Sequence, residues 1–406
     1  MDDPVWATAR PAAGDRSAIS PPPALPPARA RRPRQPCWSV GLALAVPFLV
    51  LTGLLQMLPR PPASRSGAPA TGPQPSEMSA DLASTDSGGG PSPAVAAWDG
   101  PRSNLLVFDG SGPGRAPLLG RSDALAGAAQ GVAVANGYAY LASYGSGVQV
   151  LDVRDPARPL AVGQVPATHF VYAVAAAGRH AYVAAGSGGL RVLDVADPSH
   201  PTEVGANPLL GRALGVAVAG SYAYVVAGRQ GLQVVDVGDP ADPTSVGCWC
   251  PSSFTNGVAL AGRYAYVSAY DTGLHVLDVG DPERPREVGS FTPPWNSLGV
   301  TVVGSEAYLA TQGGGVYRLD VSRPDQPTTL DTYDVAIVEP ALSSDGTNVY
   351  ATDRGCALRA LSAGDGNART TEAAYDAFGV AGAVAAVGPY LYVAVLPRDP
   401  LRQCQK

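Results

Sequence analysis

The stretch that decides the fold is "YAYVVAGRQGLQVVDVGDPADP", which runs from Tyr222 to Pro243 and rewords text found earlier in the chain. The earlier copy is "AYVAAGSGGLRVLDVADPSHP", from Ala181 to Pro201. Three residue series return every 42 positions in one register, which indicates an internal repeat rather than a bias of composition. The series are Tyr140, Tyr182, Tyr224, Tyr266, Tyr308, Tyr350 and Tyr392; Asp152, Asp194, Asp236, Asp278 and Asp320; and Asn136, Gly178, Gly220, Gly262, Gly304, Gly346 and Gly388.

One repeat contains four short apolar segments separated by turn residues. Three of them are "LGVAVAG" (Leu214–Gly220), "YAYVVA" (Tyr222–Ala227) and "LQVVDV" (Leu232–Val237), each with the length and composition of a strand. The turn "DPADP" follows, because proline fixes φ and aspartate caps the backbone of a turn. A fourth strand then carries the pair Val246–Gly247. Four strands in about 42 residues is the size of a β-propeller blade.

The repeat region begins and stops in the middle of a unit, and the two fragments complement each other. "NLLVFD" (Asn104–Asp109) and "PLLG" (Pro117–Gly120) match the third and fourth strands, whereas "GAVAAVGPYLYVAV" (Gly382–Val395) supplies only the first two. An open solenoid needs caps at its ends rather than complementary halves. We therefore predict an all-β fold, a seven-bladed β-propeller over residues 100–397 closed by N- and C-terminal half-blades, with a tail at 398–406.

The turn and the strand before it resemble a known repeat. "GLRVLDVADPSHP" (Gly189–Pro201) and "GLHVLDVGDPERP" (Gly273–Pro285) are similar to the LVIVD repeat of bacterial and archaeal surface β-propeller proteins. The resemblance spans roughly residues 104–396. It weakens in the sixth repeat, where Ser362 stands at the aspartate position and the Asp-Pro turn is missing. The resemblance implies a surface location and a binding role, and it implies no catalytic residues.

An uncharged stretch precedes the repeats. "VGLALAVPFLVLTGLLQML" (Val40–Leu58) is nineteen residues long, and at about 1.5 Å per residue a helix of this length covers roughly 28 Å, close to the thickness of a hydrocarbon core. Arg29, Arg31, Arg32 and Arg34 precede it, and Arg60 and Arg65 follow it. This bias favours a cytoplasmic amino terminus. We predict a disordered cytoplasmic segment (1–36), a transmembrane signal-anchor (37–59) and a Pro/Ser/Gly-rich linker (60–99). A cleaved signal peptide, which would make the propeller a secreted protein, is the alternative.

The composition argues against several classes of partner and cofactor. The formal net charge is −6, and Lys406 is the only lysine, so no basic surface for nucleic acid is expected. The four histidines (His169, His180, His200 and His275) fall at different repeat positions, and neither a metal site nor a cofactor is predicted. The five cysteines match no zinc pattern. A disulfide between Cys356 and Cys404, from neighbouring blades, and unpaired cysteines are the alternatives.

Function in a ring of repeats belongs where the repeats differ. The loop entering each first strand is such a place, with Gln130, Tyr172, Leu214, Asn256 and Leu298 at one equivalent position. Aromatic rings with an arginine, a glutamate and a histidine suit a ligand or a peptide. The predicted ligand-binding residues at the axial mouth are His169, Phe170, Tyr172, Arg212, Phe254, Asn256, Trp295, Asn296 and Glu339. The alternative is a variable loop surface whose aromatic residues plug the channel.

These features predict a membrane-anchored, extracytoplasmic β-propeller that binds or scaffolds a protein or a glycan. The first alternative is a propeller enzyme, a lyase or hydrolase, with Glu339, Arg212 and His169 at the axial mouth. No catalytic residue is assigned, because the sequence contains no Gly-x-Ser-x-Gly elbow, phosphate loop or His-Glu-x-x-His motif. The second alternative is a purely structural envelope protein.

Overall fold

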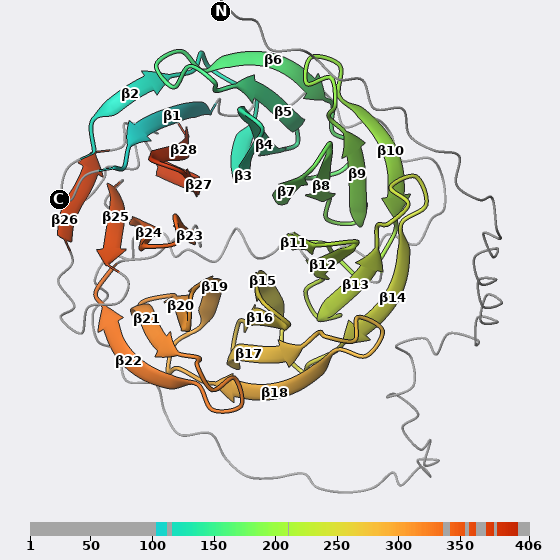
Figure 1. Ribbon diagram of the computed structural model, residues 1–406, viewed down its shortest axis with the longest axis vertical. Helices are drawn as coiled ribbons and strands as arrows, with labels where there is room; N and C mark the ends of the chain where they lie inside the picture. The colour runs from blue at the N-terminus through green and yellow to red at the C-terminus, as the bar shows by residue number, and fades with distance from the viewer. Residues whose placement is uncertain are drawn as a thin grey trace, which may run out of the picture. The chain divides into compact units, whose positions relative to one another are not determined.

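The protein folds as a seven-bladed β-propeller. The computed structural model describes residues 103–111, 116–209, 211–335, 342–353, 357–362, 371–376 and 380–396. These residues form strands β1 to β28, which pair into seven four-stranded antiparallel sheets. Figure 1 shows the sheets as blades of a ring, with the first strand of each blade innermost. The fold predicted from the 42-residue period is therefore confirmed.

Several predicted segments lie outside the described residues. They are the cytoplasmic segment (1–36), the transmembrane signal-anchor (37–59), the linker (60–99) and the tail (398–406). In the part of the chain that the structure describes, no helix has the length and hydropathy needed to cross a lipid bilayer.

Six blades are built from consecutive strands, and each blade pairs its strands in chain order. The strands are β3 (Ala128–Ala135), β4 (Tyr138–Tyr144), β5 (Gly147–Asp152) and β6 (Leu160–Val165); β7 (Ala173–Ala177), β8 (His180–Ala184), β9 (Leu190–Asp194) and β10 (Thr202–Asn207); β11 (Gly215–Ala219), β12 (Tyr222–Val226), β13 (Leu232–Asp236) and β14 (Thr244–Trp249); β15 (Thr255–Ala261), β16 (Tyr264–Ala269), β17 (Gly273–Asp278) and β18 (Arg286–Phe291); β19 (Ser297–Val303), β20 (Glu306–Thr311), β21 (Gly315–Asp320) and β22 (Thr328–Tyr333); and β23 (Leu342–Ser344), β24 (Asn348–Asp353), β25 (Ala357–Ser362) and β26 (Thr371–Asp376). In the last of these blades β25 still pairs with β26 although the sequence lacks the Asp-Pro turn, so this blade keeps four strands.

The seventh sheet combines the first two and the last two strands of the described chain. Its order is β2-β1-β28-β27, with β1 (Asn104–Asp109) and β2 (Leu118–Arg121) outside β27 (Val380–Val387) and β28 (Tyr390–Leu396). Strand β1 pairs with β28 from Asn104↔Val395 to Asp109↔Tyr390. The first strands of neighbouring blades contact each other in a cycle, β3, β7, β11, β15, β19, β23, β27 and back to β3.

The hydrophobic core lies between the blades rather than within them. Seven clusters of buried residues each draw on two adjacent blades, one cluster at every interface of the ring. Tyr140, for example, packs with Val174 and Val183 of the next blade. All seven repeated tyrosines are at most 5% exposed, which confirms that they pack between blades. Burial disfavours the phenolate and raises the pKa of Tyr140 and Tyr224.

The Val-Gly pair in the fourth strand of four blades, β6, β10, β14 and β18, has a packing reason. A Cβ added at Gly205 would lie less than 3.0 Å from the carbonyl oxygen of Pro240, which belongs to the Asp-Pro turn of the next blade. The same close approach recurs at Gly163, Gly247 and Gly289, and Gly120 of β2 makes it to Pro156. The backbones of adjacent blades touch at these glycines, so a side chain added at one of them pushes the two blades apart.

We expect Gly205→Ala to destabilise the protein by about 3 kcal/mol, because the added methyl meets backbone atoms that cannot rotate away. Urea unfolding of the full chain measures the change. Val204→Ala is the matched control, since Val204 is the exposed neighbour in the same strand and its loss is expected to cost less than about 0.5 kcal/mol. Equal stability of the two variants would show that the blades are not in contact at this glycine.

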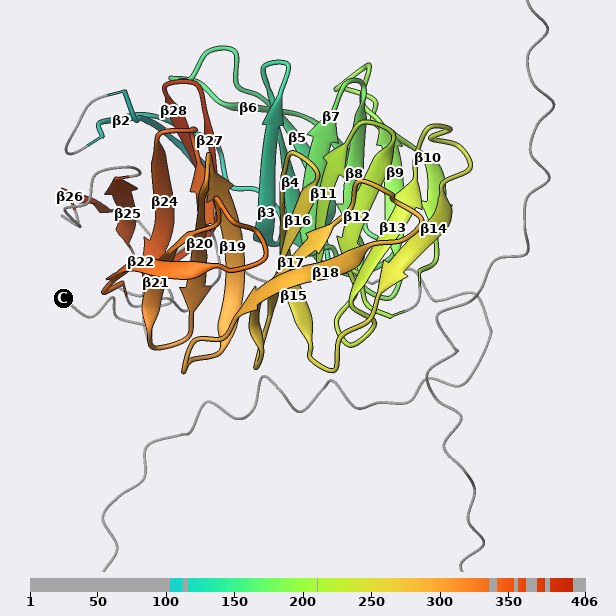
Figure 2. The same ribbon diagram turned by 60° about the horizontal axis from the view of Figure 1, so that its bottom comes forward.

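Each blade has two different ends, which Figure 2 shows from the side. We call one end the connecting-loop face; it carries the loop that enters each first strand and the turn between the second and third strands. We call the other end the Asp-Pro face; it carries the turn between the first two strands and the Asp-Pro turn. Ser103, at the start of β1, lies on the connecting-loop face, because its N–H and C=O both pair with Leu125 in the loop before β3.

Candidate functional site

Eight of the nine predicted site residues lie on the connecting-loop face. His169, Phe170 and Tyr172 are in the loop before β7, and Arg212 is in the loop before β11. The other four are Phe254 before β15, Asn256 within β15, and Trp295 and Asn296 before β19. Glu339 lies outside the described residues, as do Cys356 and Cys404, the residues of the predicted disulfide.

One group of these residues joins three consecutive blades. The ring of Tyr144, at the end of β4, stacks on Phe170 with centroids 4.2 Å apart and meets the edge of Tyr172 at 5.6 Å. Arg212 donates to the hydroxyl of Tyr172, and its guanidinium carbon lies 5.5 Å from the centroid of that ring. Arg212 thus links two neighbouring loops. The contact with Tyr172 uses some of the N–H donors of the Arg212 guanidinium group.

A second group forms what we call the aromatic platform: Phe254, Tyr270, Trp295 and Gln312. The rings of Phe254, Tyr270 and Trp295 are 36%, 38% and 49% exposed, unlike the tyrosines between the blades. They occupy neighbouring loops, since the N–H of Tyr270 donates to the C=O of Phe254 at 2.8 Å. The hydroxyl of Tyr270 donates to Oε1 of Gln312, in the next blade, at 3.0 Å.

Glycine turns support two rings of the aromatic platform. The indole of Trp295 lies against Gly313 and Gly314, and the ring of Phe254 lies against Gly228, so closely that a Cβ at Gly314 or Gly228 would overlap the ring. Glycine backbone therefore packs against each ring and limits its movement, while both residues stay partly exposed to solvent.

The two asparagines of the predicted site differ in role. Asn256 donates through Nδ2 to the C=O of Ser297 in the next blade at 2.8 Å, and its Oδ1 accepts from Ser268 at 2.8 Å. Both polar ends of Asn256 are used inside the protein, so we assign it a structural role. Asn296 accepts through its backbone C=O from the N–H of Gln312 at 2.8 Å, which fixes the loop beside Trp295.

His169 lies in a small pocket between two blades, apart from the aromatic platform. The pocket has apolar walls that include Val148, Val183 and Leu193, and the polar side chains that line it are Thr168, His169, Arg191 and Glu203. Arg191 is paired with Glu203 at 2.8 Å. Burial and the charge of Arg191 lower the pKa of His169, against a smaller opposite effect of Glu203. Burial in this pocket therefore favours the neutral imidazole of His169 over its charged form.

Three loop residues of these two groups were not predicted as site residues: Tyr144, Tyr270 and Gln312. All three stand at one repeat position, which continues as Tyr144, Gly186, Gly228, Tyr270 and Gln312 at steps of 42 residues. Where this position is glycine, a ring from the entering loop lies over it, Tyr172 at Gly186 and Phe254 at Gly228. The change of residue type at this position from one repeat to the next is the sequence signal that could have identified these residues.

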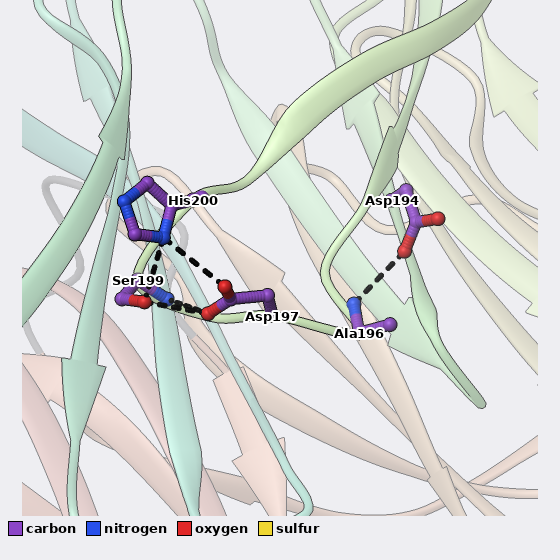
Figure 3. Close-up of polar contacts among 5 residues, drawn as sticks. All are labelled: Asp194, Ala196, Asp197, Ser199 and His200. Carbon is purple, nitrogen blue, oxygen red and sulfur yellow. Dashed lines mark hydrogen bonds and ion pairs between the residues drawn. The ribbon is translucent and has the colours of Figure 1, made fainter.

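The repeated aspartates on the Asp-Pro face cap the backbone. Asp194 accepts from the N–H of Ala196 at 2.9 Å, and Asp197 accepts from the N–H of Ser199 at 3.0 Å (Figure 3). Asp155, Asp239 and Asp281 bind the backbone in the same way. The interpretation of these residues as turn caps is confirmed. No group of metal-ligating side chains occurs among the described residues.

The turn at Asp197 also brings a serine and a histidine beside the carboxylate. Nδ1 of His200 lies 3.0 Å from the hydroxyl of Ser199 and 3.1 Å from Oδ2 of Asp197, as Figure 3 shows. A catalytic triad needs serine and aspartate on opposite nitrogens of the ring. Here both contact the same nitrogen, so no proton relay is formed. The Ser199 and His200 bonds, with the Ser199 hydroxyl first, lower the pKa of Asp197 to about 2.

The repeat units match a known family model over four stretches of the chain, residues 126–166, 171–207, 210–249 and 254–292, under the description LVIVD repeat. The chain carries LVIVD repeats. Each matched LVIVD repeat contains the four strands of one blade, from β3–β6 to β15–β18. The same four-strand unit continues beyond these LVIVD repeats in β19–β22, β23–β26 and the composite sheet.

No curated protein matches the chain by sequence. Among solved structures, the chain is similar to the crystal structure of the computationally designed Ika8 protein, with a TM-score of 0.55 and 11% sequence identity. The match covers 71% of this chain and 90% of that chain. At this identity the likeness concerns the fold alone.

Proposed function

We propose that this protein is a binding or scaffolding module that recognises a protein or a glycan through its connecting-loop face. The observation that carries the proposal is the aromatic platform. Its three rings are gathered in adjacent loops and are more exposed than the other aromatic rings whose burial the structure describes, which are buried or half-buried. Exposed aromatic residues that are already fixed in position bind partners at a low entropic cost. Tryptophan and tyrosine also dominate the energetics of protein interfaces.

The proposal predicts that Trp295→Ala weakens partner binding by roughly 30-fold, the loss of about 2 kcal/mol typical of a central aromatic residue. The test is capture of partners from an envelope extract on the full chain, followed by a binding isotherm with the captured partner. Leu160→Ala is the matched control, because Leu160 is exposed on an outer strand away from the connecting-loop face. A saturable partner that binds both variants equally well would exclude the aromatic platform as the site.

We further propose that the protein is held on the extracytoplasmic side of the cell membrane by residues 37–59, with residues 1–36 in the cytoplasm and residues 60–99 as the linker. The support is the uncharged run Val40–Leu58 and the arginines that precede it. Cleavage after this run, which would release a secreted propeller, is the alternative outcome.

We expect Leu49→Arg, at the centre of the uncharged run, to remove most of the protein from the membrane fraction, because a central arginine costs about 3 kcal/mol of insertion free energy. Gln56→Arg is the matched control, since an arginine near the end of the run reaches the interface. Carbonate extraction followed by detection of the chain measures the distribution. If the unsubstituted protein is found in the soluble fraction and lacks its amino-terminal residues, the uncharged run belongs to a cleaved signal peptide.

The ring is proposed to be closed by its two half-blades. The support is the ladder between β1 and β28 and the packing of the composite sheet against both neighbouring blades. In this arrangement, separating the ends of the ring requires breaking a strand pair and not only a packing interface.

A further inference from the structure

The aromatic platform offers apolar ring faces together with N–H donors. The hydroxyl of Tyr270 donates to Oε1 of Gln312, so one lone pair of this amide oxygen is used and the amide keeps its two N–H donors. The indole of Trp295 is a donor and has no acceptor. A ligand that fits the aromatic platform therefore has apolar rings and an excess of acceptors.

A proline-rich segment in the polyproline II conformation has this chemistry. Its pyrrolidine rings are apolar, its carbonyl groups point outward and accept hydrogen bonds, and its prolines have no N–H. Aromatic-lined grooves on other folds bind such segments for these reasons. Sugar hydroxyls, by contrast, donate as often as they accept, whereas the N–H groups of Gln312 and Trp295 can only donate.

This chain contains a proline-rich segment directly before the propeller. Residues 62–99 include Pro62, Pro69, Pro73, Pro75, Pro91 and Pro93. They precede Ser103, whose hydroxyl donates to the C=O of Gly127 at 2.8 Å on the connecting-loop face. Ser103, the first described residue after this segment, therefore lies on the face that carries the aromatic platform.

The segment is long enough to reach the aromatic platform from this position. A compact domain of about 300 residues has a radius of gyration of about 19 Å, so its width is on the order of 50 Å. A polyproline II segment rises about 3.1 Å per residue, and about 16 residues cover that width. Residues 62–99 provide more than this, which places Pro69, Pro73 and Pro75 within reach of Trp295.

We propose that residues 62–99 dock on the connecting-loop face and place their prolines on the aromatic platform. The inference rests on the proposed function, because it makes the chain's own segment an occupant of the same binding face. An intramolecular segment acts at an effective concentration in the millimolar range, so weak contacts suffice. A partner must then displace the segment before it reaches the rings.

The test is photo-crosslinking of the intact chain with benzoylphenylalanine in place of Gln74, between Pro73 and Pro75. The expected result is an intrachain adduct on peptides containing Phe254, Tyr270 or Trp295, with at least a five-fold loss of that adduct in Trp295→Ala. The matched variant replaces Pro69, Pro73 and Pro75 by serine and is expected to tighten partner binding by up to about ten-fold. This is the factor expected if the segment is docked in about nine-tenths of the molecules, because only the remaining tenth can then bind the partner.

Adducts spread over both faces, or adducts insensitive to Trp295→Ala, would overturn docking of the segment. Adducts only between chains would overturn it as well, because they assign the segment to a second molecule. Either result leaves the proposed function intact if partner binding still depends on Trp295. A third result is an adduct on the aromatic platform together with partner binding that does not depend on Trp295. This result would support docking of the segment and overturn the proposed function.

Discussion

Removing residues 103–121 is expected to abolish the cooperative fold of the propeller, because β1 and β2 supply half of the composite sheet. Leu105, Leu106 and Val107 are fully buried, and each contributes about 1.5–3 kcal/mol by burial. Their loss, with the ladder to β28, is comparable to the 5–15 kcal/mol that stabilises an ordinary domain. Thermal unfolding followed by circular dichroism measures the change.

A rearranged chain separates this explanation from a general intolerance of deletion. In it, residues 103–121 are moved from before β3 to behind Leu396 and joined to β28 by a copy of the turn Gly186–Gly189. The join is short because Asn104 pairs with Val395, next to the end of β28. We expect the rearranged chain to fold and to unfold cooperatively, at a melting temperature below that of the original chain. A deletion variant with an unchanged melting temperature would refute closure by half-blades.

Glu306→Gln is expected to destabilise the protein by about 3–5 kcal/mol, because it leaves a buried arginine without its carboxylate. Arg318 is 5% exposed, and its Nε donates to Oε2 of Glu306 at 2.8 Å. The same carboxylate oxygen accepts from the hydroxyl of Tyr308 at 2.7 Å. Equilibrium unfolding in urea measures the loss.

The repeat itself provides the control for this prediction. One blade earlier, Tyr264 and Val276 stand where Glu306 and Arg318 stand in the β19–β22 blade. The double variant Glu306→Tyr with Arg318→Val is therefore expected to recover the original stability, because apolar residues that fit a core often replace a buried ion pair without loss. A double variant as unstable as Glu306→Gln alone would show that the site depends on more than its charge balance.

The ion pair also sets a direction for the dependence of stability on pH. The bond from Arg318 is the largest cause that lowers the pKa of Glu306 from its ordinary 4.5. A carboxylate with a lowered pKa in the folded state stabilises the fold above its unfolded-state pKa. This contribution to stability is lost as the pH falls below 4.5 and through the folded-state pKa of Glu306. The double variant Glu306→Tyr with Arg318→Val has no carboxylate here, so its stability is expected to fall less on acidification.

Part of the candidate site was predictable from the 42-residue step, and part was not. The loop residues Phe254 and Trp295 stand out because the repeats differ there. The pairing of Tyr270 with Gln312 and the bracing of Tyr172 by Arg212 were not predictable. Each of these contacts joins residues about one repeat apart, and whether such residues touch depends on the distance and rotation between adjacent blades.

The structural use of Asn256 and the pocket around His169 have the same origin. Asn256 looks like a free polar residue in a loop, and only the position of Ser297 in the next blade shows that its amide is engaged. His169 occupies a loop predicted to face the axis, and the structure places it between two blades beside Arg191. Local sequence carries no information on which neighbouring blade a loop side chain meets.

The sequence by itself determined the number of blades, their strands and their turns, because these follow from local rules repeated every 42 residues: strand alternation, proline in turns and glycine at positive φ. The tertiary structure alone decided which variable residues are exposed, why Gly205 must lack a side chain and how Arg318 is neutralised. The physical reason is that these properties arise at contacts between blades, where backbone spacing and burial are set by the assembled ring and by no single repeat.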